Sequence, residues 1–208
     1  MQPLPPIARL PPHPPGLRVG LFGGSFDPPH EGHLLVSEIA LRRLRLDRLW
    51  WLVSPGNPLK DMSGRASLEA RIEACRKLAR HPRIVVSALE AEIGTRFTYD
   101  TLRYLHQRCP GVRFVWIMGA DNLLGFHRWR HWREIAALAP IAVIDRPRAT
   151  LKTQGAKAAR SLALYRLPEH DAPRLAATPP PALVLLHDRR LAHSSTALRA
   201  GQRPAAAV

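Results

Sequence analysis

Two histidines stand three positions apart at the end of a glycine-rich stretch, Gly23-Gly24-Ser25-Phe26-Asp27-Pro28-Pro29-His30-Glu31-Gly32-His33. If a helix opens here, residues at i and i+3 lie on one of its faces. The free N–H groups and the positive dipole end of a helix start attract anions. Gly32 adds no side chain, so a ligand can approach the backbone closely. Together, these features predict a place that holds a phosphate while it reacts.

The apolar runs of the chain predict the elements that position this stretch. Strands are expected at Arg18–Phe22, Leu49–Val53, Arg83–Ser87, Val112–Met118, Ile141–Ile144 and Leu183–His187. Helical patterns stand between them, at His33–Leu44, Ala66–Ala79, Tyr99–Arg108 and Trp129–Ala137. This alternation predicts an α/β fold, a doubly wound and mostly parallel sheet with helices on both faces. Ligands in such sheets bind at the carboxyl ends of strands, near a switch in strand order.

Length and composition indicate one domain. The chain has 208 residues, of which 46% are apolar. We expect a proline-rich disordered tail at 1–16, a single domain at 17–201 and a short tail at 202–208, with a partly helical excursion at 146–181. No run is long enough to span a membrane, and the start lacks the apolar core of a signal peptide. Cys75 and Cys109 have no metal or redox spacing, which indicates buried thiols in a reducing, cytoplasmic compartment.

The formal net charge of +15 predicts attraction of anions. The arginines are spread through the predicted helices and do not form one block, so a solvated basic surface is favoured over a nucleic-acid footprint. Helix-turn-helix, zinc-finger and RNP-type patterns are all missing from the sequence. A nucleotide or pyrophosphate ligand would also gain from this charge.

Other interpretations of the glycine-rich stretch fit less well. A Walker A loop needs a Gly-Lys-Ser/Thr sequence, and a dinucleotide fingerprint needs GxGxxG; the stretch has neither. Two histidines that bind zinc on a helix are usually four residues apart, and a third ligand would be needed. Asp27 is expected to cap the helix that follows.

The stretch resembles the opening of the nucleotidylyltransferase superfamily marked by His-x-Gly-His, and within it the bacterial nicotinate mononucleotide adenylyltransferases. Further segments of the chain match that family in order: Ser54-Pro55-Gly56-Asn57-Pro58-Leu59-Lys60, Phe97-Thr98-Tyr99-Asp100-Thr101-Leu102, Met118-Gly119-Ala120-Asp121-Asn122-Leu123-Leu124 with Phe126 and Trp129, Asp145-Arg146-Pro147, and Ser194-Ser195-Thr196-Ala197-Leu198-Arg199. The resemblance implies a Rossmann-like nucleotidylyltransferase fold. It also implies AMP transfer from ATP to nicotinate mononucleotide, yielding nicotinate adenine dinucleotide and pyrophosphate, in NAD biosynthesis.

A second phosphate site is expected after the last predicted strand. Ser and Thr favour helix starts, and Arg199 lies one turn beyond Ser195 and Thr196 on the same face. Hydroxyls, amide groups and a guanidinium suit a polyphosphate. The segment alone favours a simple capped helix, and the first histidine motif shifts the preference to a phosphate site. His193 departs from the family, which commonly has isoleucine there. The resemblance implies that ATP is bound by Gly23, Gly24, Ser25, Phe26, His30, His33, Gly119, Asp121, Ser194, Ser195, Thr196 and Arg199, with His30, His33 and Arg199 catalytic.

The acceptor nucleotide is expected at a separate group of residues. The resemblance places it near Asn57, Thr98 and Trp129, and the charges of Lys60 and Arg146 suit its phosphate or carboxylate. The Trp129 ring offers a flat face for a cationic pyridinium. Alternatively, Trp129 belongs to the core, Thr98 caps a helix and Lys60 is solvated. Separately, Trp132 is expected to pack inward, and Asp121 either contacts ligand or closes its loop.

The implied reaction is an in-line attack of a phosphate oxygen on the α-phosphorus of ATP, without a covalent intermediate. A phosphate monoester is already anionic at neutral pH, so no strong general base is required. Catalysis then rests on positioning and charge stabilisation, and Mg²⁺ arrives with ATP without a dedicated protein metal site. The rivals are phosphopantetheine adenylyltransferase or another His-x-Gly-His nucleotidylyltransferase and, more distantly, a basic nucleic-acid-binding module. We therefore expect small-molecule substrates, with neither nucleic acid nor a membrane as partner.

Overall fold

A single parallel sheet organises the protein, whose computed structural model describes residues 10–56, 66–145 and 155–187. Seven strands lie in the order β3-β2-β1-β4-β5-β7-β6, and each described pair is parallel. The strands are β1 (Arg18–Gly24), β2 (Arg48–Val53), β3 (Ile84–Ser87), β4 (Arg113–Gly119), β5 (Ile141–Asp145), β6 (Arg166–Leu167) and β7 (Leu183–His187). The chain runs outward from β1 to β3 and then returns to place β4 on the other side of β1. The carboxyl ends of β1 and β4 therefore flank the switch in strand order, where open α/β sheets bind ligands.

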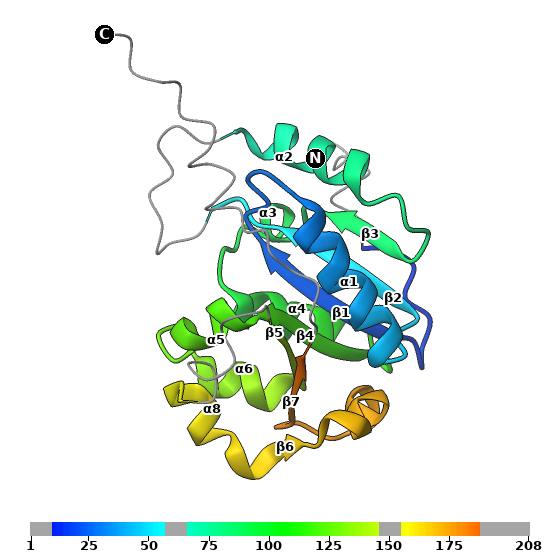
Figure 1. The fold of residues 1–208 in the computed structure, drawn as a ribbon. Helices are drawn as coiled ribbons and strands as arrows, with labels where there is room; N and C mark the ends of the chain where they lie inside the picture. The colour runs from blue at the N-terminus through cyan, green and yellow to red at the C-terminus, as the bar shows by residue number, and fades with distance from the viewer. Residues whose placement is uncertain (1–9, 57–65, 146–154, 188–208) are drawn as a thin grey trace, which may run out of the picture.

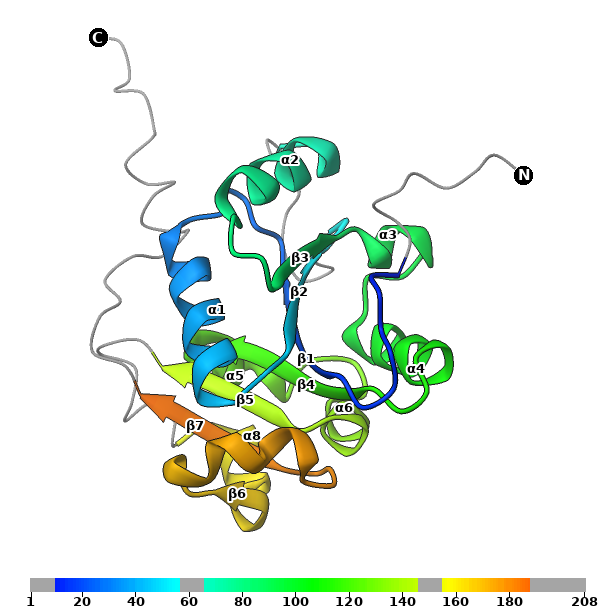
Figure 2. The ribbon, with the colours of Figure 1, turned by 90° about the vertical axis from the view of Figure 1, so that its right-hand side faces the viewer.

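Helices cover both faces of this sheet, as Figures 1 and 2 show. The helices are α1 (Glu31–Arg43), α2 (Leu68–Leu78), α3 (Leu89–Glu92), α4 (Thr98–Arg108), α5 (Ala120–Phe126), α6 (Trp132–Leu138) and α8 (Lys157–Ser161), with 3-10 helices η2 (Ala163–Tyr165) and η3 (Glu169–Ala177). Apolar residues of α1, α2 and η3 belong to one core cluster, and those of α4, α5, α6 and α8 belong to the other. The doubly wound, mostly parallel fold predicted from the sequence is confirmed.

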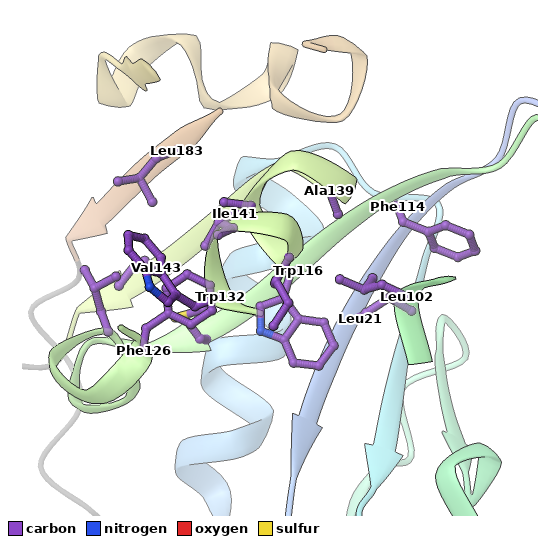
Figure 3. Packing of buried hydrophobic residues seen from close by; sticks show 14 of the residues in the cluster. Leu21, Leu102, Phe114, Trp116, Phe126, Trp132, Ala139, Ile141, Val143 and Leu183 are labelled. Atoms are coloured by element: carbon purple, nitrogen blue, oxygen red, sulfur yellow. The ribbon is translucent and has the colours of Figure 1, made fainter. Parts of the chain in front are cut away.

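The two core clusters follow from the alternation of side chains along each strand. In β2, Trp50 and Leu52 point into the cluster with α4 to α6, whereas Trp51 and Val53 point into the cluster with α1. Each of these four side chains is completely buried. Figure 3 shows the first cluster, in which aromatic rings from β4, α5 and α6 lie close together. The sheet is therefore packed against helices on both of its faces.

The predicted strands and helices are all present, with ends shifted by up to three residues. The helix expected from Trp129 begins at Trp132, because His131 has a left-handed φ of 56° and interrupts the helical backbone. The short helices α3, α5 and α8 and the two-residue β6 were not predicted, since so few residues show no periodicity. The described part of the predicted excursion, residues 155–181, is partly helical. No helix in the described ranges is long and apolar enough to cross a membrane.

Residues 10–16, which the sequence assigned to a tail, lie against the core. Leu10 packs on the cluster with α4, Pro11 is buried, and the Gly16 N–H donates to the Gly111 carbonyl at 2.8 Å. The proline-rich composition predicted a disordered tail through residue 16, and it did not indicate these contacts with the domain. The other domain boundaries stay predictions.

Candidate active site

The turn from β1 to α1 carries the first group of candidate site residues. A Cβ atom at Gly23 would lie 2.7 Å from the Trp116 ring, so the backbone approaches β4 more closely than another residue would allow. Phe26 adopts a left-handed φ of 47°, which is unfavourable for a residue with a side chain. Its buried ring stacks on Trp51 with centroids 4.9 Å apart. The predicted ATP-binding residues Gly23, Gly24, Ser25 and Phe26 therefore make a fixed turn at the carboxyl end of the central strand.

The two histidines cap helix α1. The Gly32 N–H donates to His30 Nδ1 at 3.0 Å, and the His30 N–H donates to His33 Nδ1 at 3.1 Å. Together they form a capping box in which His30 is the N-cap residue. The expectation that Asp27 caps this helix is wrong, because Asp27 lies three residues before the N-cap and the His30 ring satisfies the helix amide instead.

These hydrogen bonds also determine where the imidazole protons lie. A neutral imidazole carries one N–H donor and one acceptor nitrogen. Because Nδ1 of both rings accepts an amide hydrogen, Nε2 must carry the proton in both neutral rings. The ring centroids of His30 and His33 are 3.9 Å apart. The capping box thus creates two neighbouring Nε2–H donors, which are suited to an anion.

A buried chain of hydrogen bonds ties the first turn of α1 to β2. The Trp51 indole N–H donates to Ser37 Oγ at 2.8 Å, and the Ser37 hydroxyl donates to the His33 carbonyl at 2.7 Å. The His33 ring also lies 4.8 Å from the Phe26 ring and 5.9 Å from the Phe22 ring. Since Trp51 and Ser37 are fully buried, the position of His33 is set by the core.

Gly119 and Asp121 lie at the neighbouring strand end. Gly119 is the last residue of β4 and the N-cap of α5, and Asp121 is exposed in the first turn of that helix. A Cβ atom at Gly119 would lie 2.5 Å from Asp121 Oδ1, so the carboxylate folds back over the strand end. This position beside the strand end and the exposure of Asp121 are compatible with both of the roles considered above.

The predicted acceptor residues Thr98 and Trp129 belong to adjacent segments. Thr98 is the first residue of α4, and the neighbouring Tyr99 ring lies 4.6 Å from the His131 ring. Arg130 forms an ion pair with Asp100 at 3.6 Å.

Thr98 does not cap α4, which was the alternative role considered for it. The N-cap residue of this helix is Phe97, and its side chain forms no cap hydrogen bond.

Trp129 combines a core contact with an exposed part. Its ring meets Phe126 edge-on with centroids 5.3 Å apart and Trp116 edge-on at 6.3 Å. The side chain is half-buried, whereas Trp132 is buried as predicted. The rigid setting and the remaining exposure suit a stacking surface.

Several predicted site residues lie outside the described residues. They include the two basic residues expected to contact the acceptor and the segment expected to form the second phosphate site. These are Asn57, Lys60, Arg146, Ser194, Ser195, Thr196 and Arg199. Within the described ranges, no group of three His, Cys, Asp or Glu side chains is placed to hold a metal ion.

A buried carboxyl group, which the sequence did not indicate, lies between the end of β2 and the first turn of α4. Glu90 on α3 is only 5% exposed. The Thr101 hydroxyl donates to Glu90 Oε1 at 3.1 Å, and the Ser54 side chain also hydrogen-bonds this carboxyl. Burial raises the pKa of Glu90 to about 7, against the two hydrogen bonds, which act to lower it. Glu90 therefore joins the end of β2 to the first turn of α4.

Glu90 gives a testable dependence of stability on pH. Between its ordinary pKa of 4.5 and about 7, the folded protein keeps a proton that the unfolded chain releases. The free energy of unfolding of the natural protein should therefore fall by about 2–3 kcal/mol as pH rises through this window. Glu90→Gln has no proton to lose. The free energy of unfolding of the variant, relative to that of the natural protein, should therefore increase as pH rises from 4.5 to 7.5. Urea unfolding at both pH values measures this.

Glu38→Gln, at an exposed position of α1, is the control for this measurement. Its stability difference from the natural protein should be nearly the same at the two pH values. A Glu90→Gln difference that is equally insensitive to pH would contradict the assignment.

Comparison with known proteins places the chain among nucleotidyl-transferring proteins. Residues 21–201 match the sequence model of the cytidylyltransferase-like family. The chain is 58% identical over 183 residues to a probable nicotinate-nucleotide adenylyltransferase of Methylorubrum extorquens, covering 88% of this chain and 99% of that protein. It is 55% identical over 183 residues to the protein of the same description from Brucella suis biovar 1, covering 88% and 94%.

Solved structures show the same architecture. Plasmodium falciparum nicotinic acid mononucleotide adenylyltransferase complexed with NaAD has a TM-score of 0.66 at 16% identity, covering 88% of this chain and 83% of that chain. The complex of the same protein with APC has a TM-score of 0.64. At this identity, the likeness supports the fold alone.

Proposed function

Because the chain belongs to the cytidylyltransferase-like family, and within it to the nicotinate-nucleotide adenylyltransferases, we propose that it transfers the adenylyl group of ATP to nicotinate mononucleotide. The products are nicotinate adenine dinucleotide and pyrophosphate, and the reaction belongs to NAD biosynthesis. The observation that carries the mechanism is the capping box of His30 and His33. It lies at the start of α1, beside the switch in strand order.

The proposed nucleophile is a phosphate oxygen of the mononucleotide. The second pKa of a phosphate monoester is about 6, so this oxygen is anionic at neutral pH. In-line attack on the α-phosphorus forms the new P–O bond as the bond to pyrophosphate breaks. The protein then has to orient the two phosphates and stabilise the negative charge that develops between them.

His30 and His33 are proposed to donate their Nε2 hydrogens to the α- and β-phosphate oxygens of ATP. Both Nδ1 atoms are already occupied by helix amides, so the donors are oriented before ATP binds. Preoriented donors cost little reorganisation in the transition state. The positive end of the α1 dipole favours the same charge.

The remaining predicted residues complete the proposed site. We propose that Ser194, Ser195, Thr196 and Arg199 hold the triphosphate and that Arg199 stabilises the departing pyrophosphate. Gly23 to Phe26, Gly119 and Asp121 surround ATP at the ends of β1 and β4. Mg²⁺ enters as the complex with ATP, because phosphate oxygens and water are its preferred ligands.

The acceptor is proposed to stack on Trp129, beside Thr98, with Asn57, Lys60 and Arg146 contacting its polar groups. The exposed part of the Trp129 ring supports this placement. We propose a cytoplasmic enzyme that acts on these small molecules and not on nucleic acid. The two described cysteines, which are free and buried, suit a reducing compartment.

The proposed function is tested by pyrophosphate release from MgATP with four additions: nicotinate mononucleotide, its amide analogue, phosphopantetheine, or no acceptor. Release should be fastest with nicotinate mononucleotide and absent without an acceptor. Release with phosphopantetheine alone would assign the chain to the rival adenylyltransferase. Binding to DNA with steep salt dependence, and no release with any acceptor, would favour a nucleic-acid-binding module.

His33→Ala should lower kcat by about a hundredfold, the typical effect of removing one preoriented donor from a transition state. His81→Ala is the matched control, because His81 Nδ1 also accepts a backbone hydrogen, from Arg83 at 3.1 Å. His81 lies just before the amino end of β3, whereas the candidate site lies at the carboxyl ends of the strands. The kcat of His81→Ala should stay within about twofold of the natural value. Steady-state rates with both substrates saturating measure the effect, and near-natural turnover in His33→Ala would remove this residue from the mechanism.

Trp129→Ala should raise the KM for the mononucleotide far more than the KM for ATP. The lost stacking surface contacts only the acceptor in the proposed site, and such stacking typically contributes about 1 kcal/mol or more, equivalent to at least about fivefold in KM. Separate titrations of the two substrates measure the ratio, with the ATP titration as the internal control. Equal changes in both constants would move Trp129 out of the acceptor pocket.

A further inference from the structure

We propose that Arg71 is a positioning residue that holds the ATP-binding turn and the acceptor loop in fixed relation to each other. This inference rests on the proposed function, because it assigns the turn at Ser25 to ATP and the loop that begins at Ser54 to the mononucleotide. Arg71 itself lies on α2, outside both segments.

Hydrogen bonds from one guanidinium join three separate segments. Nη1 of Arg71 donates to the carbonyl oxygens of Ser25 and Ser54, both at 2.7 Å. Nε donates to the Ala66 carbonyl at 3.2 Å, and Nη2 approaches the Pro55 carbonyl at 3.5 Å. The residue is only 3% exposed. The side chain therefore crosses from α2 to the ends of both β1 and β2.

The hydrogen bonds of Arg71 lie directly beyond the point where the pairing of β1 with β2 ends. The last hydrogen bond between the two strands runs from the Ser54 N–H to the Gly24 carbonyl at 2.9 Å. Beyond this hydrogen bond, the segment after β1 turns through Phe26 towards α1, and the segment after β2 continues towards Gly56. Arg71 takes up the next carbonyl on each side, those of Ser25 and Ser54. Arg71 thus adds one more link between the two segments beyond the last hydrogen bond of the sheet, at the point where each segment enters its proposed substrate site.

The chemistry of arginine suits this task. The guanidinium is planar, keeps its charge and presents five N–H donors in a fixed fork. Hydrogen bonds from a charged donor are stronger than neutral ones. A lysine keeps the charge but has a single nitrogen, so it cannot reproduce the same set of contacts. Without the fork, each loop keeps its own substrate contacts but loses its fixed distance from the other.

This loss should appear in kcat more than in KM. Two reacting groups displaced by about 1 Å can lose up to about a hundredfold in rate. Arg71→Lys and Arg71→Met should therefore lower kcat by about 10- to 100-fold, while both KM values change by less than about threefold. The assay is run well below the melting temperature of each variant, and circular dichroism gives the folded fraction.

Arg83→Met is the matched control, because Arg83 Nη1 also donates to a backbone carbonyl, that of Leu46 at 3.1 Å. This contact lies at the amino end of β3, away from the carboxyl ends of the strands. Arg83→Met should lower stability without lowering kcat by more than about twofold. A folded Arg71→Lys with kcat within twofold of natural, or with both KM values raised and kcat unchanged, would overturn the proposal. If Arg71→Met does not fold, Arg71→Lys decides alone.

A second measurement is independent of the reaction. Amide hydrogen exchange in Arg71→Lys should become faster together in peptides covering residues 22–29 and 52–56, and remain unchanged there in Arg83→Met. Faster exchange confined to α2 would overturn the proposal. If the natural protein released no pyrophosphate with nicotinate mononucleotide, the proposed function would fail while this measurement would still decide whether Arg71 couples the two loops.

Discussion

The hydrogen bonds between two imidazole rings and the first amides of α1 determine how the candidate site works. They satisfy helix amides that would otherwise lack partners and place the two rings 3.9 Å apart. They also assign the proton of each neutral ring to Nε2. One local interaction thus caps the helix, orients His30 and His33 and makes both of them donors. In the proposed mechanism, helix capping and phosphate binding are two uses of the same pair of side chains.

The rest of the fold keeps this pair in place at the switch in strand order. Phe26 stacks on Trp51, whose indole also donates to Ser37, and Ser37 holds the His33 carbonyl. These groups are buried, so their geometry is set by core packing rather than by solvent-exposed contacts. Arg71 connects the same turn to the end of β2. In the proposed mechanism, the two imidazole donors are therefore positioned before ATP arrives, as electrostatic catalysis requires.

Much of this arrangement could be predicted from local sequence, and some of it could not. Buried strands and amphipathic helices have clear periodic patterns, and the spacing of His30 and His33 marks a helix start. Asp27 was assigned the cap because carboxylates favour that position, but residue type alone does not show where the helix begins. Arg71 and Glu90 escaped notice because their importance comes from burial against segments distant in sequence. A charged residue on a helix is usually solvated, and only the tertiary structure reveals these two exceptions.

In the proposed mechanism, helix amides hold both Nδ1 atoms, so that the Nε2–H of each ring is the group that donates to phosphate. Nitrogen-15 NMR of histidine-labelled protein near pH 8 reports the protonation of each ring nitrogen, with His30→Asn and His33→Asn variants for assignment. We expect both rings to show an unprotonated Nδ1 and a protonated Nε2, and a non-hydrolysable ATP analogue to shift the Nε2 resonances. A proton on Nδ1 of either ring, or Nε2 resonances that do not change when the nucleotide binds, would contradict it.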